Sequence, residues 1–302
     1  MRHTKVAIIG AGAVGSTTAY ALILKGIAAE IMLIDIDEKR CTGEILDLSD
    51  ALPFSESSKV LKGTIADART ADIIIICAGV AQKPDQSRLD LTKTNKKIVT
   101  SIIKDLQPIG KNTIVMIVTN PVDVMTFFAL KESGLPENQL FGTGTFLDTQ
   151  RVRGLLSKKL NIAEQSIHAY VLGEHGDSQF PAWSSAEIAG TPITDLEKLD
   201  KKQLDKIAQE TKNKAYEIIK CKGATYFGIA ACVSALCENI LFDQKRIAPV
   251  STFNKDFGVC LSMPAVIGAN GAEKIIKTSL NQEETKQLEL SAKKIKETIE
   301  IT

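Results

Sequence analysis

The stretch KVAIIGAGAVGSTTAYALILKG, residues 5–26, joins a short apolar run to an apolar helical segment through Gly10, Gly12 and Gly15. In this spacing the first glycine permits a tight turn and the second lets backbone N–H groups approach a pyrophosphate. The third lets the helix pack closely against the preceding strand. The start of the helix adds a partial positive charge that favours an anion. Asp35 ends the next apolar run, where a carboxylate can accept hydrogen bonds from ribose hydroxyls. The stretch therefore predicts a strand–turn–helix unit that binds a dinucleotide.

Apolar runs and helical segments alternate through the first half of the chain. Short, continuous apolar runs recur at KVAIIG (5–10), EIMLID (30–35), DIIIICAG (72–79) and NTIVMIVTN (112–120). Continuous runs are typical of strands that are covered on both faces of a parallel sheet. Repeated strand–helix units favour a doubly wound arrangement. We therefore expect an α/β fold, with a doubly wound parallel Rossmann sheet over residues 1–142.

Ligands of such sheets bind at the carboxyl ends of the strands, which here carry glycine, aspartate and asparagine. Asp35 and nearby Asp37 would repel a 2′-phosphate, and Arg40 is the closest counter-charge. These charges favour NAD over NADP, although Asp35 could instead only form a turn. The expected cofactor-binding residues are Gly10, Gly12, Val14, Gly15, Asp35, Gly79 and Asn120.

From about residue 143 the pattern changes to longer helical segments and runs that fit hairpins. Helical patterning is found in 149–161, in a charged region near 196–222 and in 223–242, whereas IAPVSTFN and GVCLSMPAVIGANGA are typical of antiparallel strands. Asn281 and Glu284 have capping-box spacing, and the last helix then has an apolar face made of Leu288, Ala292, Ile295 and Ile299. We therefore expect a second, α+β substrate domain over residues 143–302, which shares a broad interface with the first.

The composition excludes several classes of function. The 302 residues carry a net charge of +1 and no basic stripe with interleaved aromatic residues, which argues against a nucleic-acid partner. The apolar stretches fall far short of the roughly 20 residues that a membrane span needs, so no membrane partner is expected. The six cysteines show no CxxC pair and no Cys/His cluster at metal spacing. We expect reduced cysteines packed as small apolar residues, no metal site and a cytoplasmic location.

Five polar motifs follow the glycine fingerprint along the chain. They are AQKPDQSRLDL (81–91), VTNPVDV (118–124), GTFLDTQRVR (144–153), GEHGDS (173–178) and KGATYFG (222–228). Together with the fingerprint they resemble the motifs of the lactate/malate dehydrogenase family, and the resemblance runs from about residue 5 to the C-terminal helix. It implies an NAD-dependent enzyme that transfers a hydride between nicotinamide and a small 2-hydroxy acid.

Three residues of these motifs suit that chemistry. Oxidation of a 2-hydroxy acid needs a base for the hydroxyl proton, and an imidazole suits the role because its unperturbed pKa of about 6.5 lies near working pH. The resemblance implies that His175 is this base and that Asp148 holds its second ring nitrogen. A guanidinium grips a carboxylate at two points, and Arg151 shares a helix face with Asp148, three residues earlier. A turn histidine and a solvated arginine are the plainer interpretation of the same residues.

Two further residues complete the expected site. The polar segment 81–90 follows a strand and predicts a loop that can close over the site. The resemblance implies that its Arg88 polarises the substrate oxygen. Asn120 ends a strand beside the expected nicotinamide position, where it could bond the substrate oxygen or only form the Asn-Pro turn.

Residue 82 bears on the choice of substrate. Malate dehydrogenases of the family carry an arginine at this position, which matches a second carboxylate, whereas lactate dehydrogenases carry glutamine and then lysine, as Gln82 and Lys83 do here. Closing a neutral Gln82 over oxaloacetate would bury a carboxylate without a partner, while pyruvate brings only a methyl group. Lys83 is cationic, but it should point elsewhere in an extended loop. Thr225 also matches the lactate-type pocket wall, so the resemblance implies pyruvate and L-lactate as substrates.

Two alternatives stay open at this point. One is a malate or other 2-hydroxyacid dehydrogenase. The other is a non-catalytic dinucleotide-binding sensor, which would require a broken site, and none of the five motifs is broken.

The resemblance also implies a regulator. Arg153 and His168 fall where the fructose-1,6-bisphosphate-activated bacterial members carry their phosphate-binding pair, at a subunit interface of a tetramer. Cationic groups that face their symmetry copies repel one another, and a bisphosphate would relieve that repulsion. We therefore expect a homotetramer activated by fructose 1,6-bisphosphate, most strongly at neutral to alkaline pH where a histidine is uncharged. The plainer alternative is a strand-edge His168 and a solvated Arg153.

Overall fold

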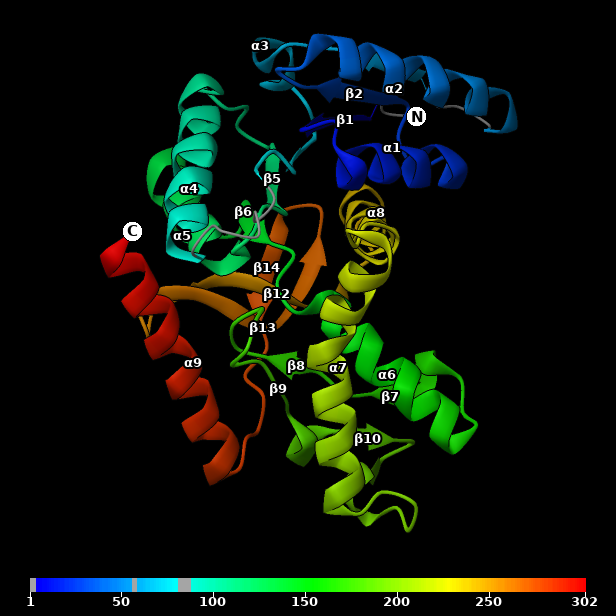
Figure 1. Cartoon of the computed structure of the whole chain (residues 1–302), viewed down its shortest axis with the longest axis vertical. Coiled ribbons are helices and arrows are strands. Elements are labelled where there is room, and N and C mark those ends of the chain that lie inside the picture. Colours follow the sequence, from blue (N-terminus) through cyan, green and yellow to red (C-terminus); the bar gives the residue numbers. More distant parts are fainter. Residues whose placement is uncertain (1–3, 56–58, 81–87) are drawn as a thin grey trace.

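The computed structural model describes residues 4–55, 59–80 and 88–302, without the side chain of Arg88. Within these residues the central feature is a nine-stranded sheet in the order β14-β13-β12-β6-β5-β4-β1-β2-β3 (Figure 1). Its strands are β1 (Lys5–Ile9), β2 (Glu30–Ile34), β3 (Lys59–Lys62), β4 (Ile73–Ile76), β5 (Ile114–Ile117), β6 (Leu140–Gly142), β12 (Arg246–Asn254), β13 (Val259–Gly268) and β14 (Gly271–Ile275).

Short strands and the helices complete the described chain. One small sheet contains β7 (Ile167–His168), β10 (Glu187–Ile188) and β11 (Thr191–Pro192). A second contains β8 (Val171–Leu172) and β9 (Phe180–Pro181). The helices are α1 (Ala13–Lys25), α2 (Glu38–Ala51), α3 (Ile65–Ala68), α4 (Arg88–Asp105), α5 (Val122–Ser133), α6 (Phe146–Leu160), α7 (Lys201–Lys222), α8 (Phe227–Leu241) and α9 (Gln282–Ile301).

Six parallel strands form this half of the sheet, the four that the sequence predicted together with β3 and β6. β1 pairs with β2 and β4, and the pairing continues outwards to β3 on one side and through β5 to β6 on the other. β4 and β5 are buried at every position, which explains their continuous apolar runs. The order β3-β2-β1-β4-β5-β6 is that of a doubly wound nucleotide-binding sheet and confirms the predicted fold class. β3 has a single buried residue, Val60, so the apolar runs did not reveal it.

The antiparallel strands β12, β13 and β14 continue the same sheet. β12 pairs with β13 along its whole length and meets β6 where Ser251 lies opposite Gly142. A Cβ on Gly142 would come within 2.8 Å of Val122 Cγ2 and 3.2 Å of Ser251 Cβ, so glycine lets the strands approach here. The sequence predicted these strands as part of a second α+β unit, but not that they extend the parallel sheet.

Three apolar clusters hold the layers together. α1, α2 and α8 cover one face of the sheet, and α4, α5 and α9 cover the other. The third cluster joins α6 and α7 to β7 and β8 in the lower part of Figure 1. α8 contacts both α1 and α6, so it links the first half of the chain to the second.

The last helix, α9, begins as the sequence predicts. Asn281 Oδ1 accepts the Glu284 N–H at 2.9 Å, and the Glu284 carboxylate accepts the Asn281 N–H at 3.1 Å. Its buried apolar face, which includes Leu288 and Ile295, packs in the second cluster. No helix within the described ranges is long and apolar enough to cross a membrane.

Close packing of α1 yields a prediction about stability. A Cβ on Gly15 would overlap the carbonyl oxygen of Gly10. Gly15→Ala must therefore push α1 away from β1, and we expect the free energy of unfolding to fall by about 1–3 kcal/mol. Gly43→Ala is the matched control, because Gly43 lies inside α2 and an added Cβ would meet no neighbouring heavy atom within 4 Å. It should stabilise the protein by about 0.5–1 kcal/mol. Chemical denaturation measures both changes, and equal stabilities would contradict the close approach of α1.

Candidate active site

The glycine turn between β1 and α1 leaves room for a phosphate group. Gly10 has a φ of +106°, and a Cβ there would lie 2.6 Å from Ala78 N, so a side chain does not fit. An added Cβ on Gly12, by contrast, would meet no heavy atom within 4 Å. Gly12 is the N-cap of α1 and provides no side-chain cap, so the first N–H groups of the helix are available to an anion. These features fit the pyrophosphate of a dinucleotide.

Asp35 ties this turn to the end of β2. Its carboxylate accepts the Ala11 N–H at 2.6 Å and the Asp37 N–H at 2.9 Å, so it does form a turn. Carboxylate oxygens can accept further hydrogen bonds, which leaves Asp35 able to receive ribose hydroxyls. Arg40 Nε lies 3.8 Å from Glu44 Oε1 on the same helix, and this pairing makes Arg40 a poor counter-charge for a 2′-phosphate.

The other residues expected at the cofactor have varied surroundings. Val14 is half-buried on α1 and packs against the first apolar cluster. A Cβ on Gly79 would lie 2.7 Å from Thr119 Cγ2, so this glycine lets the ends of β4 and β5 come together. Asn120 is exposed at the end of β5 and lines a neighbouring cavity.

That cavity has a volume of about 500 Å³ and holds the expected base. Its walls come from the first turns of α4, the turn after β5, α6, the segment 174–179, α7 and the last turn of α9. The charged or ionisable side chains that line it are Asp148, Arg151, Glu174, His175, Asp177, Lys212 and Tyr216. Elements from both halves of the sequence therefore meet around one site.

Three side chains in this cavity form one bonded group. His175 Nδ1 lies 2.6 Å from Asp148 Oδ2, and Arg151 Nη1 donates to Asp148 Oδ1 at 3.0 Å. Only 2% of the Asp148 side chain is exposed, against 27% of the His175 ring. Asp148 and Arg151 lie three residues apart on α6 and share a face, as the sequence predicted. One carboxylate thus fixes both an imidazole and a guanidinium at the cavity wall.

The protonation of this group follows from its surroundings. Burial alone would lower the pKa of His175, but the Asp148 carboxylate outweighs it and raises the pKa above that of an ordinary histidine. Burial also opposes ionisation of Asp148, yet His175 and then Arg151 hold the pKa of this carboxyl below its usual value. The pair therefore favours an imidazolium beside a carboxylate, from which a proton can be delivered into the cavity.

A second buried carboxylate holds the backbone of the same histidine. Asp123 Oδ2 accepts the His175 N–H at 2.7 Å, and only 2% of Asp123 is exposed. Burial raises the pKa of Asp123 to about 6, although the hydrogen bond from the His175 backbone acts in the opposite direction. Asp123 lies in the motif VTNPVDV, yet the sequence analysis gave it no role. It fixes the main chain at the residue whose side chain meets Asp148.

Asn95 and Gln179 also shape the cavity and were missed in the sequence. Asn95, on α4, is 2% exposed; it accepts the Val80 N–H at 2.9 Å and donates to the Asn120 carbonyl at 2.8 Å. It therefore joins the segment after β4 to the turn after β5. Gln179 is buried and its side chain hydrogen-bonds to Asp148. Both residues come shortly after motifs that the sequence analysis identified. The sequence does not show which group a single amide side chain in a helix or turn will bond to.

Three residues expected at the substrate are not placed in this group. Gln82 lies outside the residues that the structure describes, and Arg88 begins α4 without a described side chain. Thr225 lies in the turn between α7 and α8, half-buried, and is not among the residues that line the cavity. Their roles therefore stay predictions.

The two residues expected at the effector lie together on another surface. Arg153 points away from the cavity, since its Nε donates to the Ala169 carbonyl at 3.1 Å and its guanidinium lies 5.1 Å from the Tyr170 ring centroid. Burial lowers the pKa of Arg153. His168 is exposed on β7, directly before Ala169, and pairs with Glu187 of β10 in the antiparallel ladder.

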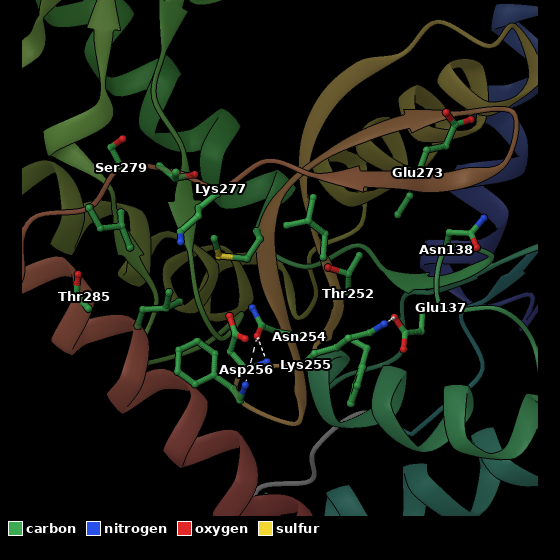
Figure 2. Close-up of a pocket in the computed structure, with 18 residues that line it drawn as sticks. Glu137, Asn138, Thr252, Asn254, Lys255, Asp256, Glu273, Lys277, Ser279 and Thr285 are labelled. Carbon is green, nitrogen blue, oxygen red and sulfur yellow. Dashed lines mark hydrogen bonds and ion pairs between the residues drawn. The ribbon is translucent and has the colours of Figure 1, made fainter.

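A larger groove of about 1050 Å³ lies apart from these residues (Figure 2). The turn between β12 and β13, β14 and the start of α9 line it. Two of its polar side chains make contacts within the lining: Lys255 Nζ lies 3.4 Å from Glu137 Oε2, and Asn254 Oδ1 accepts the N–H groups of Asp256 and Phe257. Its described lining holds no buried, bonded set of charges like that around Asp148, so we assign the site to the smaller cavity.

Two family models match the chain in succession. The model of the NAD-binding domain of lactate/malate dehydrogenase matches residues 4–142, and the model of the alpha/beta C-terminal domain of lactate/malate dehydrogenase matches residues 145–302. The L-lactate dehydrogenase of Lacticaseibacillus casei is 40% identical over 98% of this chain and 94% of its own length. That of Acetivibrio thermocellus is 41% identical over 98% of this chain and 96% of its own length.

Solved structures show the same fold. A lactate dehydrogenase from a Medee basin deep-sea metagenome library has a TM-score of 0.95 and 36% identity, covering 100% of this chain and 99% of its own. The minor L-lactate dehydrogenase of Enterococcus mundtii, in a ligands-bound form, has a TM-score of 0.95 and 37% identity over 98% of each chain.

The bonded group predicts how one substitution changes the titration of His175. Asp148→Asn removes the charge that raises the pKa of the ring and leaves burial, which lowers it. We expect the midpoint to fall, as for the loss of a close, buried counter-charge. NMR titration of the ring measures this midpoint directly. The assignment is simple because the chain has three histidines. Asp177→Asn is the control, because Asp177 is exposed and its carboxylate bonds to Tyr216 instead. A midpoint that is the same in Asp148→Asn as in the wild type would contradict the assigned coupling.

Proposed function

The chain belongs to the lactate/malate dehydrogenase family, and from this premise we propose that it is an NAD-dependent L-lactate dehydrogenase that interconverts L-lactate and pyruvate. The observation that carries the proposal is the bonded group of His175, Asp148 and Arg151, at the same edge of the sheet as the glycine turn. An imidazole and a guanidinium held by one carboxylate suit a small anion whose oxygen, on the carbon beside its carboxylate, gains or loses a proton.

The residues of the cavity perform the proton transfer. In pyruvate reduction Arg151 grips the substrate carboxylate, because only its Nη1 is engaged by a described residue. His175 then donates the proton on Nε2 to the carbonyl oxygen, while Nδ1 stays bonded to Asp148. In lactate oxidation the neutral ring takes the hydroxyl proton, and Asp148 stabilises the imidazolium that results.

The other end of the site would hold the cofactor. NAD, when bound, accepts or supplies the hydride at substrate C2 through its nicotinamide ring. The open turn at Gly12 and the uncapped start of α1 would hold the pyrophosphate. Asp35 would receive the ribose hydroxyls, and Asn120 would orient the substrate oxygen from the end of β5.

The segment that follows β4 would select the substrate. In this proposal Arg88 brings a positive charge to the carbonyl oxygen when the loop closes. Gln82 would face the methyl group of pyruvate, and Thr225 would form the opposite wall. A second carboxylate on the substrate would have no charged partner at Gln82, which disfavours oxaloacetate.

We further propose activation by fructose 1,6-bisphosphate. The support is the position of Arg153 and His168, whose side chains belong to neighbouring segments joined by the bond from Arg153 to Ala169. Glu187, opposite His168, adds a carboxylate with which a phosphate has to compete. We therefore expect the effector to bind more weakly here than it would without Glu187.

A homotetramer in the cytoplasm completes the proposal. Phe54 and Phe227 are 83% and 66% exposed and both line a cavity of about 460 Å³ beside α1 and α2. Apolar surface of this kind is often covered by a second copy. The six cysteines are free thiols, which suits a reducing compartment.

A panel of 2-oxo acids tests the substrate. With NADH, the wild-type protein should have a higher kcat/KM for pyruvate than for oxaloacetate. Gln82→Arg should shift that ratio towards oxaloacetate by about 10- to 100-fold, because a guanidinium pairs with the second carboxylate. Lys83→Gln is the control and should change the ratio less than about twofold if its side chain points away from the substrate, since removing a charge that makes no contact costs little.

The same panel separates the alternatives. A wild-type preference for oxaloacetate would make the protein a malate dehydrogenase, and a preference for longer 2-oxo acids would make it another 2-hydroxyacid dehydrogenase. Binding of NADH without turnover of any acid would identify a dinucleotide sensor.

Steady-state kinetics and sedimentation test the effector. Saturating fructose 1,6-bisphosphate should lower the pyruvate KM and shift association towards the tetramer, most strongly at neutral to alkaline pH. Arg153→Gln and His168→Gln should abolish this response with kcat retained. Glu187→Gln should lower the effector concentration for half-maximal activation, because it removes the competing carboxylate. The proposal fails if the effector leaves both the KM and the association state of the wild type unchanged.

A further inference from the structure

The segment that carries His175 is bonded to α9 through a serine without a role so far. Ser291, on α9, is fully buried, and its Oγ accepts the Glu174 N–H at 2.6 Å. The same Oγ lies 3.0 Å from Ser178 Oγ. Ser178 Oγ in turn donates to the Glu174 carboxylate. A closed ring of hydrogen bonds therefore links both ends of the segment 174–178 to one point on α9.

The direction of each hydrogen bond in this ring is determined. An ionised carboxylate only accepts, so the Ser178 hydroxyl must donate to Glu174. The proton between the two serines then has to come from Ser291, which donates to Ser178. Ser291 also accepts the Glu174 N–H, so its single hydroxyl satisfies a donor and an acceptor at once.

The Ser291 hydroxyl lies in a closely packed part of the structure. A Cβ on Gly173 would lie 2.5 Å from Ser291 Oγ and 3.0 Å from Ser291 Cβ, so backbone and helix are in close contact. Gly173 has a φ of +88° and is fixed on its other side by paired backbone bonds with Ser262 of β13.

Two successive backbone amides are thus held by two different helices. The Glu174 N–H is bonded to Ser291 of α9, and the His175 N–H is bonded to Asp123 of α5. Together the contacts fix the two successive peptide units that precede the His175 side chain. That side chain must reach Asp148 Oδ2 at 2.6 Å while facing the cavity.

We propose that Ser291 is a positioning residue for the acid–base histidine: its buried hydroxyl fixes the backbone at Glu174 so that the His175 ring meets Asp148. This role rests on the proposed dehydrogenase function. It also explains why α9, whose Thr298 and Ile301 line the cavity, belongs to the catalytic unit and does not merely cover the sheet.

Removing the hydroxyl should affect chemistry more than binding. Ser291→Ala leaves the buried Glu174 N–H without an acceptor, and the segment can satisfy it only by moving. A displacement of this kind misaligns His175, and shifts of about 1 Å can cost a hundredfold in rate. The glycine turn that would hold NAD is remote in sequence and belongs to other elements. We therefore expect kcat for pyruvate reduction to fall about 10-fold or more, while the NADH dissociation constant changes less than about twofold.

The experiment compares three variants with the wild type in kinetics, NADH binding and NMR titration of His175. Ser291→Ala should lower kcat and also lower the His175 midpoint, because the contact that raises it is loosened. Ser178→Ala keeps the acceptor for the Glu174 N–H and should lower kcat less than about threefold. Ser234→Ala is the matched control, since Ser234 is a fully buried helical serine on α8 whose hydroxyl has no partner among the described residues. It should leave kcat and the midpoint unchanged.

Each outcome decides the inference. A lower melting temperature in Ser291→Ala with unchanged kcat and His175 midpoint would show a purely structural serine and overturn the proposal. An equal loss in Ser178→Ala would also overturn it, because the acceptor would then not be what matters. If the wild type turns over no 2-oxo acid, the proposed function fails first, whereas an active wild type with a fully active Ser291→Ala rejects only the positioning role.

Discussion

The structure depends on one buried carboxylate that is hydrogen-bonded to two cationic side chains. Asp148 accepts from His175 on one oxygen and from Arg151 on the other, with 2% of its side chain exposed. A carboxylate this deeply buried is stable only because both partners are in place, since a buried charge without them would be costly. The imidazole and the guanidinium are therefore not positioned independently, because both are bonded to one side chain on one turn of α6.

The rest of the fold can be understood as support for that carboxylate and its histidine. The segment after β8 is held by β13 at Gly173, by α9 at Glu174 and by α5 at His175. These three elements come from different parts of the sequence and meet because β12 joins the parallel sheet at β6. That continuation of the sheet, together with the packing of α9 against α5, fixes the antiparallel strands and α9 relative to the ends of the parallel strands.

Much of this arrangement could be predicted from the sequence. The glycine spacing, the continuous apolar runs and Asp35 at a strand end are local patterns, and they specified the doubly wound sheet. Asp148 and Arg151 are three residues apart, so helical periodicity alone placed them on one face. The expected role of His175 as the base rests on its residue type and on the family resemblance, and it stays a prediction.

The supports could not be predicted because their contacts are remote in sequence. Ser291 is 117 positions from Glu174, and Asp123 is 52 positions from His175. A serine on the buried face of an amphipathic helix has the same pattern as any small packing residue, and an aspartate after Asn-Pro has that of a helix start. The extension of the sheet through Gly142 has a similar cause, since a three-residue strand carries too little pattern to identify its neighbours.

A crystal structure with NADH and oxamate, an analogue of pyruvate that does not accept a hydride, tests the central claim most directly. We expect the oxamate carboxylate on the guanidinium of Arg151 and its carbonyl oxygen within hydrogen-bond reach of His175 Nε2, with Asp148 still bridging both residues. An oxamate bound elsewhere in the cavity, or a His175 ring that has left Asp148 to meet it, would contradict the account.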